Sequence, residues 1–141
     1  MTVRDAMTPA VVSVGPMHTV REAARRMAQR KVGAAIVIDP EAPGPGIITE
    51  RDVLEAIGAG ADPDMERVSA HLTRAVVYAR PSWSLEEAAA AMVRGGFRHL
   101  VVIEDAEIAG VISVRDIVGA WVGEGASCAL ATTAAGAAAS A

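Results

Sequence analysis

An internal repeat is the feature that most constrains what this chain can fold into. Residues 3–38 align with residues 68–103 without a gap, and after a one-residue deletion in the second copy, residues 46–52 align with residues 110–116. Identical residues recur along the alignment: Val3/Val68, Thr8/Thr73, Pro16/Pro81, Glu22/Glu87, Met27/Met92 and Ile38/Ile103. Because a copy of about 55 residues is only marginally stable alone, we expect the two copies to bury their apolar faces against each other.

Each copy predicts the same series of elements. Thr19 and Ser84 are each followed three residues later by Glu, a capping-box pattern that marks a helix start, and apolar residues recur behind them at helical spacing. Short β-rich runs flank these helices at residues 11–12, 34–38, 46–48, 76–77, 100–103 and 110–112. A second helix is expected to begin at Thr49 and at Ser113. The sequence therefore predicts an α+β fold in which the order β-α-β-β-α occurs twice.

The boundaries of these elements predict the domain organisation. We expect the first helix of each copy to end at the glycines that follow its apolar stripe, near Gly33 and near Gly95. The expected parts of the chain are residues 3–58 as the first repeat, 59–67 as a linker, 68–122 as the second repeat and 123–141 as a flexible Ala-rich tail.

The composition argues against nucleic acid as a partner. With a formal net charge of −4 and 3% aromatic residues, the chain lacks the basic groove and stacking platform that single-stranded nucleic-acid binders use. The basic residues between Arg21 and Lys31 keep nucleic acid open as a weak alternative, although such a run is more often a solvated helix face.

No catalytic or metal-binding constellation is recognisable in the sequence. Cys128 is the one cysteine and the three histidines are far apart, so we expect no disulfide, no metal site and no enzymatic activity. The N-terminus lacks the basic-then-apolar pattern of a signal peptide, and no stretch has the apolar content of a membrane span. A cytoplasmic location without membrane contact is therefore expected.

Two matching segments carry the most chemical information, Gly-Ile-Ile-Thr-Glu-Arg-Asp at 46–52 and Gly-Val-Ile-Ser-Val-Arg-Asp at 110–116. A hydroxyl followed three residues later by Asp is itself a capping box, so helix capping alone could account for both. However, an Arg precedes the Asp in each copy, and a helix N-terminus presents unpaired N–H groups to a phosphate. An Asp there can also accept the hydroxyls of a ribose. Capping and nucleotide binding are compatible, and both interpretations stay open.

With these segments, Met7-Thr8-Pro9, Val32-Gly33-Ala34 and Phe-Arg-His-Leu-Val-Val at 97–102, the sequence resembles a tandem pair of cystathionine β-synthase (CBS) domains, a Bateman module, over residues 3–122. The resemblance implies two repeats that pack through their sheets about a pseudo-two-fold axis. It also implies clefts for adenosine-containing ligands such as AMP, ADP, ATP or S-adenosylmethionine, with no cofactor required. Such modules commonly pair into homodimers.

The resemblance assigns residues to two clefts. Cleft A would be formed by Ile47, Thr49, Arg51, Asp52, Val77, Phe97, Arg98 and His99. Cleft B would be formed by Val12, Val32, Gly33, Ala34, Val111, Ser113, Arg115 and Asp116. By the same resemblance, Asp52 would hold the ribose, Thr49 and the basic side chains the phosphates, and Val77 with Phe97 the adenine. Because the second repeat has Arg98-His99 where the first has Gly33-Ala34, we expect cleft A to be more positive and to bind nucleotide more tightly.

These observations favour a stand-alone regulatory module that binds an adenosine-containing ligand and signals by a change of conformation to a protein partner that the sequence does not identify. The alternative is a structural or protein-interaction module that binds no nucleotide and keeps its motif residues as helix caps.

Overall fold

The computed structural model describes residues 1–9, 11–74 and 77–132, with residues 124–132 described by their backbone alone. Its first sheet has the strand order β1 (Ser13–Val14), β2 (Ala34–Val37), β3 (Gly46–Thr49) and β4 (Thr73–Arg74). Its second sheet has the order β5 (Tyr78–Ala79), β6 (His99–Glu104) and β7 (Glu107–Ser113). In each sheet the first pair of strands is parallel and the following pairs are antiparallel.

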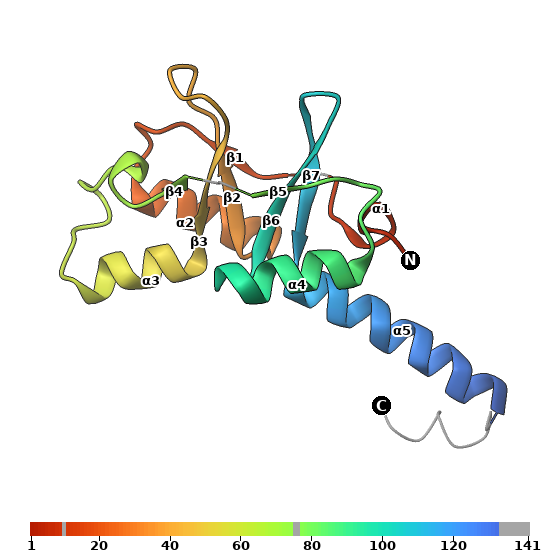
Figure 1. Ribbon diagram of the computed structural model, residues 1–141. Helices are drawn as coiled ribbons and strands as arrows, with labels where there is room; N and C mark the ends of the chain where they lie inside the picture. The colour runs from red at the N-terminus through yellow and green to blue at the C-terminus, as the bar shows by residue number, and fades with distance from the viewer. Residues whose placement is uncertain (10, 75–76, 133–141) are drawn as a thin grey trace.

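Four helices occupy the positions that the repeat predicts, and a short helix and a 3-10 turn that were not predicted lie at the starts of the two repeats. The helices are α1 (Val3–Ala6), α2 (Val20–Arg30), α3 (Glu50–Gly58), α4 (Leu85–Gly95) and α5 (Val114–Thr132), with a 3-10 turn η1 at Val68–Ala70. The β2–β3 and β6–β7 hairpins project to the same side of the molecule, and α3, α4 and α5 lie on the other (Figure 1). The predicted α+β fold with two copies of strand, helix, hairpin and helix is confirmed.

The two repeats pack through their sheets. Ala34 and Ile36 of β2, Ile47 of β3 and Val101 of β6 form one buried cluster that joins the sheets, and all four are at most 7% exposed. The strand β2 is buried along its whole length, because its other face covers the helices of the first repeat. Such strands have near-continuous apolar sequences, which explains the run from Ala34 to Val37.

The short segment at the start of each repeat packs into the core of the other repeat. Val3 of α1 is fully buried in the core of the second repeat, whereas Val68 of η1 is fully buried in the core of the first. Equivalent backbone bonds hold the two segments: the Val3 N–H donates to the Trp83 carbonyl and the Val68 N–H donates to the His18 carbonyl, each at 2.8 Å. The repeats are therefore interlocked rather than merely adjacent.

The helix ends differ from the prediction in the first repeat. The helix α4 ends at Gly95, with Gly96 in the left-handed conformation at φ 70°, as expected. The helix α2 ends at Arg30 and not near Gly33, because the equivalent residue Lys31 takes the left-handed conformation at φ 56°. A non-glycine residue in this conformation is uncommon, so the pattern of glycines misplaced the helix end.

One of the two expected capping boxes is only half formed. Ser84 and Glu87 exchange both bonds, since Glu87 Oε2 accepts from the Ser84 N–H at 2.7 Å and Ser84 Oγ accepts from the Glu87 N–H at 3.0 Å. Thr19 accepts from the Glu22 N–H at 3.2 Å, but the Glu22 carboxylate pairs with Arg25 and Arg26 instead of returning to Thr19. Two guanidinium groups one turn away attract that carboxylate more strongly than a single backbone N–H.

The first strand of each repeat is displaced from its predicted position. Residues 11–12 precede β1, although the Val12 carbonyl still accepts from the Ile36 N–H at 2.8 Å. Likewise Val77 precedes β5, while Val76 lies outside the described residues. Val11 and Val12 still pack against the buried clusters, which is the reason for their apolar character.

Residues 123–132, part of the tail expected to be flexible, belong to the helix α5. The helix α5 continues to Thr132, and Figure 1 shows it extending well beyond the second sheet. Alanine and leucine have high helix propensity, so an Ala-rich segment that follows a packed helix can continue it. The remainder of the predicted tail, 133–141, lies outside the described residues.

Candidate functional site

Both motif segments form helix caps where a strand passes into a helix. Asp52 Oδ2 accepts from the Thr49 N–H at 2.8 Å and from the Thr49 hydroxyl at 3.1 Å, and Thr49 Oγ1 is 3.3 Å from the Asp52 N–H. At the start of α5, Asp116 Oδ2 accepts from the Ser113 N–H at 2.9 Å and Ser113 Oγ accepts from the Asp116 N–H at 3.1 Å. Among the described residues, all side-chain hydrogen bonds to these carboxylates go to Oδ2. Capping therefore leaves Oδ1 of each Asp available to a ligand.

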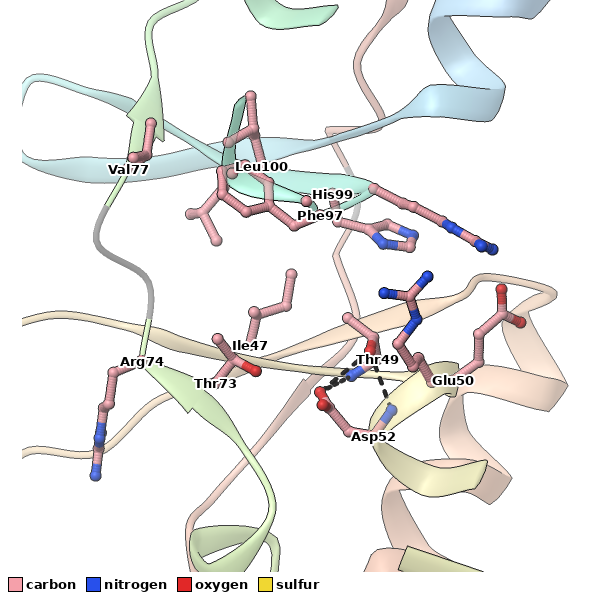
Figure 2. A pocket seen from close by; sticks show the side chains of 15 residues that line it. Ile47, Thr49, Glu50, Asp52, Thr73, Arg74, Val77, Phe97, His99 and Leu100 are labelled. Carbon is pink, nitrogen blue, oxygen red and sulfur yellow. Dashed lines mark hydrogen bonds between the residues drawn. The ribbon is translucent and has the colours of Figure 1, made fainter. Parts of the chain in front are cut away.

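A cavity of about 260 Å³, here called cavity A, lies between the two repeats. All eight residues predicted for cleft A line it: Ile47, Thr49, Arg51, Asp52, Val77, Phe97, Arg98 and His99. In Figure 2, Thr49 and Ile47 come from the first repeat on one side, and Phe97 and His99 face them from the second. The structure therefore brings the predicted set together across the junction of the repeats.

A second cavity of about 770 Å³, here called cavity B, lies at the equivalent junction. All eight residues predicted for cleft B line it: Val12, Val32, Gly33, Ala34, Val111, Ser113, Arg115 and Asp116. Its volume is within the range of small-molecule sites, whereas that of cavity A is slightly below this range.

The expected concentration of positive charge in cleft A is wrong. Arg98 and His99 line both cavities, and Lys31 adds a charge to cavity B that the sequence comparison did not count. Arg74 also lines cavity A, but it pairs with Asp39 at 3.4 Å and its side chain points away from the opposing repeat (Figure 2). Since a basic residue at the junction serves both cavities, charge alone does not favour cavity A.

Glu50 is an acidic site residue that the sequence comparison missed. It lines both cavities and lies directly after Thr49, at the first position of α3. Its equivalent in the second repeat is Val114, so the repeat alignment itself offered no signal for an acidic group here. The one available signal was its place between two motif residues, Thr49 and Arg51.

Gly33 lies beside both Glu50 and His99. A β-carbon at Gly33 would lie 3.1 Å from Glu50 Oε1 and 3.3 Å from His99 Nε2, so both side chains converge on the space that glycine leaves. Burial lowers the pKa of His99, because desolvation disfavours the charged imidazolium; the negative charges of Glu50 and Asp116 partly oppose this shift. The residues that line both cavities are thus polar, with His99 partly buried and Glu50 exposed.

Other chemistry is not evident in the described part of the chain. Residues 1–9, 11–74 and 77–123 contain no group of three His, Cys, Asp or Glu side chains arranged to hold a metal ion. Within those same ranges, no helix is long and apolar enough to span a bilayer. In the basic run of α2, Arg21 pairs with Asp64, and Arg25 and Arg26 pair with Glu22, which favours the solvated-face interpretation.

Comparison with known proteins places these features in a family. Residues 3–59 and 68–123 each match the family model for the CBS domain. The chain is 31% identical over 116 residues to the CBS domain-containing protein YhcV of Bacillus subtilis, an alignment that covers 82% of each protein. This chain therefore belongs to the CBS-domain family and contains two CBS domains.

Two further similarities differ in extent. The CBS domain-containing protein CBSCBSPB3 of Arabidopsis thaliana is 34% identical over 114 residues, which are 80% of this chain but 20% of that protein. The CBS domain protein PAE2072 from Pyrobaculum aerophilum, solved in complex with AMP, has 28% sequence identity and a TM-score of 0.74, covering 82% of this chain and 89% of PAE2072.

Proposed function

We propose that this chain is a regulatory CBS pair that binds an adenosine-containing ligand, such as AMP, ADP, ATP or S-adenosylmethionine, between its repeats. The observation that carries the proposal is the composition of each cavity wall. One repeat contributes a helix start with an Arg and an Asp that keeps one oxygen free, and the other contributes apolar strand residues. This combination suits a ligand with phosphate, ribose and a flat apolar base.

Each part of such a ligand has a partner in cavity A. Arg51 and Arg98 can bind a phosphate bidentately, and the start of α3 favours negative charge. Asp52 Oδ1 can accept from the ribose hydroxyls while Oδ2 keeps the helix cap. Phe97 and Val77 offer apolar surface to the adenine. The complex of PAE2072 with AMP supports this class of ligand.

The mechanism we propose is regulatory rather than catalytic. A ligand that touches both repeats stabilises the relative orientation in which both sets of contacts are made, and it shifts the population only by its difference in affinity between orientations. Val3 and Val68 each pack into the core of the other repeat, so a change in the relative orientation of the repeats would alter the packing of both cores. A partner that contacts both repeats would then detect the ligand.

We further propose that the chain pairs with a second copy through α3 and α5. Apolar residues at equivalent positions of these helices are exposed: Leu54 by 71% and Ile57 by 47% on α3, and Val118 by 47% and Trp121 by 43% on α5. Sedimentation should show a dimer that Trp121→Glu weakens. Trp83, in contrast, packs against the core of the second repeat. The substitution Trp83→Glu would therefore test folding and not pairing.

The same exposed residues keep the second candidate function open, a protein-interaction module whose cavities bind nothing. The two functions differ in what Asp52 does. As a cap alone, its replacement by Ala costs about 1 kcal/mol of stability whether or not nucleotide is present. As a ligand contact, its replacement also removes the stabilisation that nucleotide provides.

The experiment is a thermal-shift panel with AMP, ADP, ATP, S-adenosylmethionine and NADH on the wild type, Asp52→Ala and Asp116→Ala. A ligand at about 100 times its Kd stabilises by about 2.7 kcal/mol, a shift of several degrees for a chain of this size. We expect at least one adenosine compound to raise the Tm of the wild type and one of the Asp variants to lose that shift. No shift with any compound, while both variants remain folded, would leave the interaction module as the function.

A further inference from the structure

Three polar residues, Glu50, Arg98 and His99, belong to both cavities at once. Glu50 begins α3 in the first repeat, while Arg98 and His99 lead into β6 in the second. Glu50 and His99 meet beside Gly33, where a single β-carbon would touch both. These three side chains are here called the shared wall.

The chain has one such wall because the repeats differ at these positions. The equivalents of Glu50, Arg98 and His99 are Val114, Gly33 and Ala34, which carry no charge. All three equivalents line cavity B and none lines cavity A. Each cavity keeps an arginine of its own, Arg51 in cavity A and Arg115 in cavity B, but both cavities share the single cation Arg98.

The charges of the shared wall cannot serve two anions equally well. Arg98 supplies one positive charge and Glu50 one negative charge, and burial keeps His99 predominantly neutral near pH 7. The charged groups that face His99 are Glu50, Asp116, Arg98 and Arg115, two of each sign. A phosphate in one cavity that engages Arg98 withdraws this cation from the other cavity. The other cavity then keeps its own arginine, Arg51 or Arg115, but still faces the Glu50 carboxylate and the first phosphate.

We infer that the two cavities are negatively coupled for phosphate-bearing ligands: an anion bound in one lowers the affinity of the other for a second anion. This inference rests on the proposed function, since it requires nucleotide in the cavities. It adds that charge, rather than shape, sets how many nucleotides one chain holds. An uncharged nucleoside has no phosphate to pair with Arg98 or to be repelled by the Glu50 carboxylate. Its binding in one cavity therefore does not change its affinity for the other.

The test is a thermodynamic cycle measured by calorimetry with AMP and with adenosine. Asp52→Ala reports the affinity of cavity B alone, and Asp116→Ala reports that of cavity A alone. For independent cavities, the overall affinity of the wild type for two ligands equals the product of these two single-cavity affinities. For AMP, we expect the overall affinity of the wild type to be about tenfold lower than that product, a size typical of coupling between sites. For adenosine, we expect the overall affinity to equal the product.

Variants of the exposed residues Arg51, which lines only cavity A, and Arg115, which lines only cavity B, provide a second cycle if either Asp variant unfolds. Equality between the wild type and the product for AMP would overturn the coupling and leave the proposed function intact. A deficit of the same size with adenosine would also overturn it, because the coupling would then not depend on phosphate. If the wild type binds no AMP, the proposed function fails and the coupling falls with it.

Discussion

The two repeats share their core packing and their motif caps, and they differ in several of the residues that line the junction between them. Ile48 and Ile112 are both fully buried in the cores, and the motif helices of both repeats begin with the same cap. The differences gather at the cavities: Gly33-Ala34 against Arg98-His99, and Glu50 against Val114. The comparison teaches that packing keeps the copies alike, while the junction between them accumulates the charges that give each cavity its character.

The largest effect is expected from truncating the equivalent core residues Ile48 and Ile112. Each substitution by Ala removes fully buried methyl groups and leaves a cavity, which costs about 2–5 kcal/mol. Both tryptophans lie in the second repeat, so their fluorescence reports on that half of the chain. Because the repeats are interlocked, Ile48→Ala should lower the urea midpoint of the tryptophan transition as much as Ile112→Ala does.

A tryptophan midpoint that moves with Ile112→Ala but not with Ile48→Ala would break the comparison. It would mean that the repeats unfold separately and that Val3 and Val68 are not enough to join them. Val93→Ala is the matched control, since Val93 is 82% exposed and its truncation should leave the midpoint unchanged.

A smaller difference is expected between the equivalent glycines Gly46 and Gly110. A β-carbon at Gly110 would lie 2.5 Å from the Thr8 carbonyl oxygen, which is fixed by backbone bonds with Val111. At Gly46 the nearest atom is the flexible Leu72 Cδ1 at 2.8 Å, and the nearest backbone oxygen is 3.2 Å away. Gly110→Ala should cost about 1–3 kcal/mol in chemical denaturation, and Gly46→Ala should cost less. Equal costs would show that the second repeat relaxes as readily as the first.

The prediction of the fold from sequence succeeded for the hairpins and the motif helices, whereas the first strand of each repeat was misplaced although both copies carry the same signal there. The hairpins and the motif caps appear in both, and each was placed correctly. The exchange of Val3 and Val68 between cores was not predictable, because both positions hold valine and an apolar residue does not specify which core it enters. The end of α2 and the role of Glu50 were missed for a related reason. Lys31 and Glu50 each differ from their repeat equivalent, so the alignment concealed them.

A gain in stability of about 0.5–1 kcal/mol is expected from Lys31→Gly. Lys31 holds the left-handed conformation that Gly96 provides without strain in the second repeat, and relief of this strain exceeds the added freedom of the unfolded chain. The reverse change, Gly96→Lys, should destabilise by a similar amount. A loss of stability in Lys31→Gly would show that the lysine side chain contributes more to the fold than its backbone costs.

The smallest expected effect concerns pH and His99. Burial lowers its pKa in the folded chain, so the unfolded chain binds more protons and stability falls as the pH drops from the ordinary value of about 6.5 toward the lowered one. His99→Gln should lose less stability than the wild type between about pH 7.5 and pH 5.5 in urea titrations. An identical pH dependence in the two proteins would mean that His99 is fully solvated, and the shared wall would lose its partly buried member.

The most direct test of the central claim, that adenosine ligands bind between the repeats, is to follow backbone amide signals by NMR as AMP is added. The account predicts that the amides of Glu50, Arg51 and Asp52, or those of Val114, Arg115 and Asp116, shift together with those of Phe97 to His99. The tips of the two hairpins should stay unchanged as an internal control. Shifts confined to residues outside both cavities, or none at either helix start with AMP in large excess, would contradict the account.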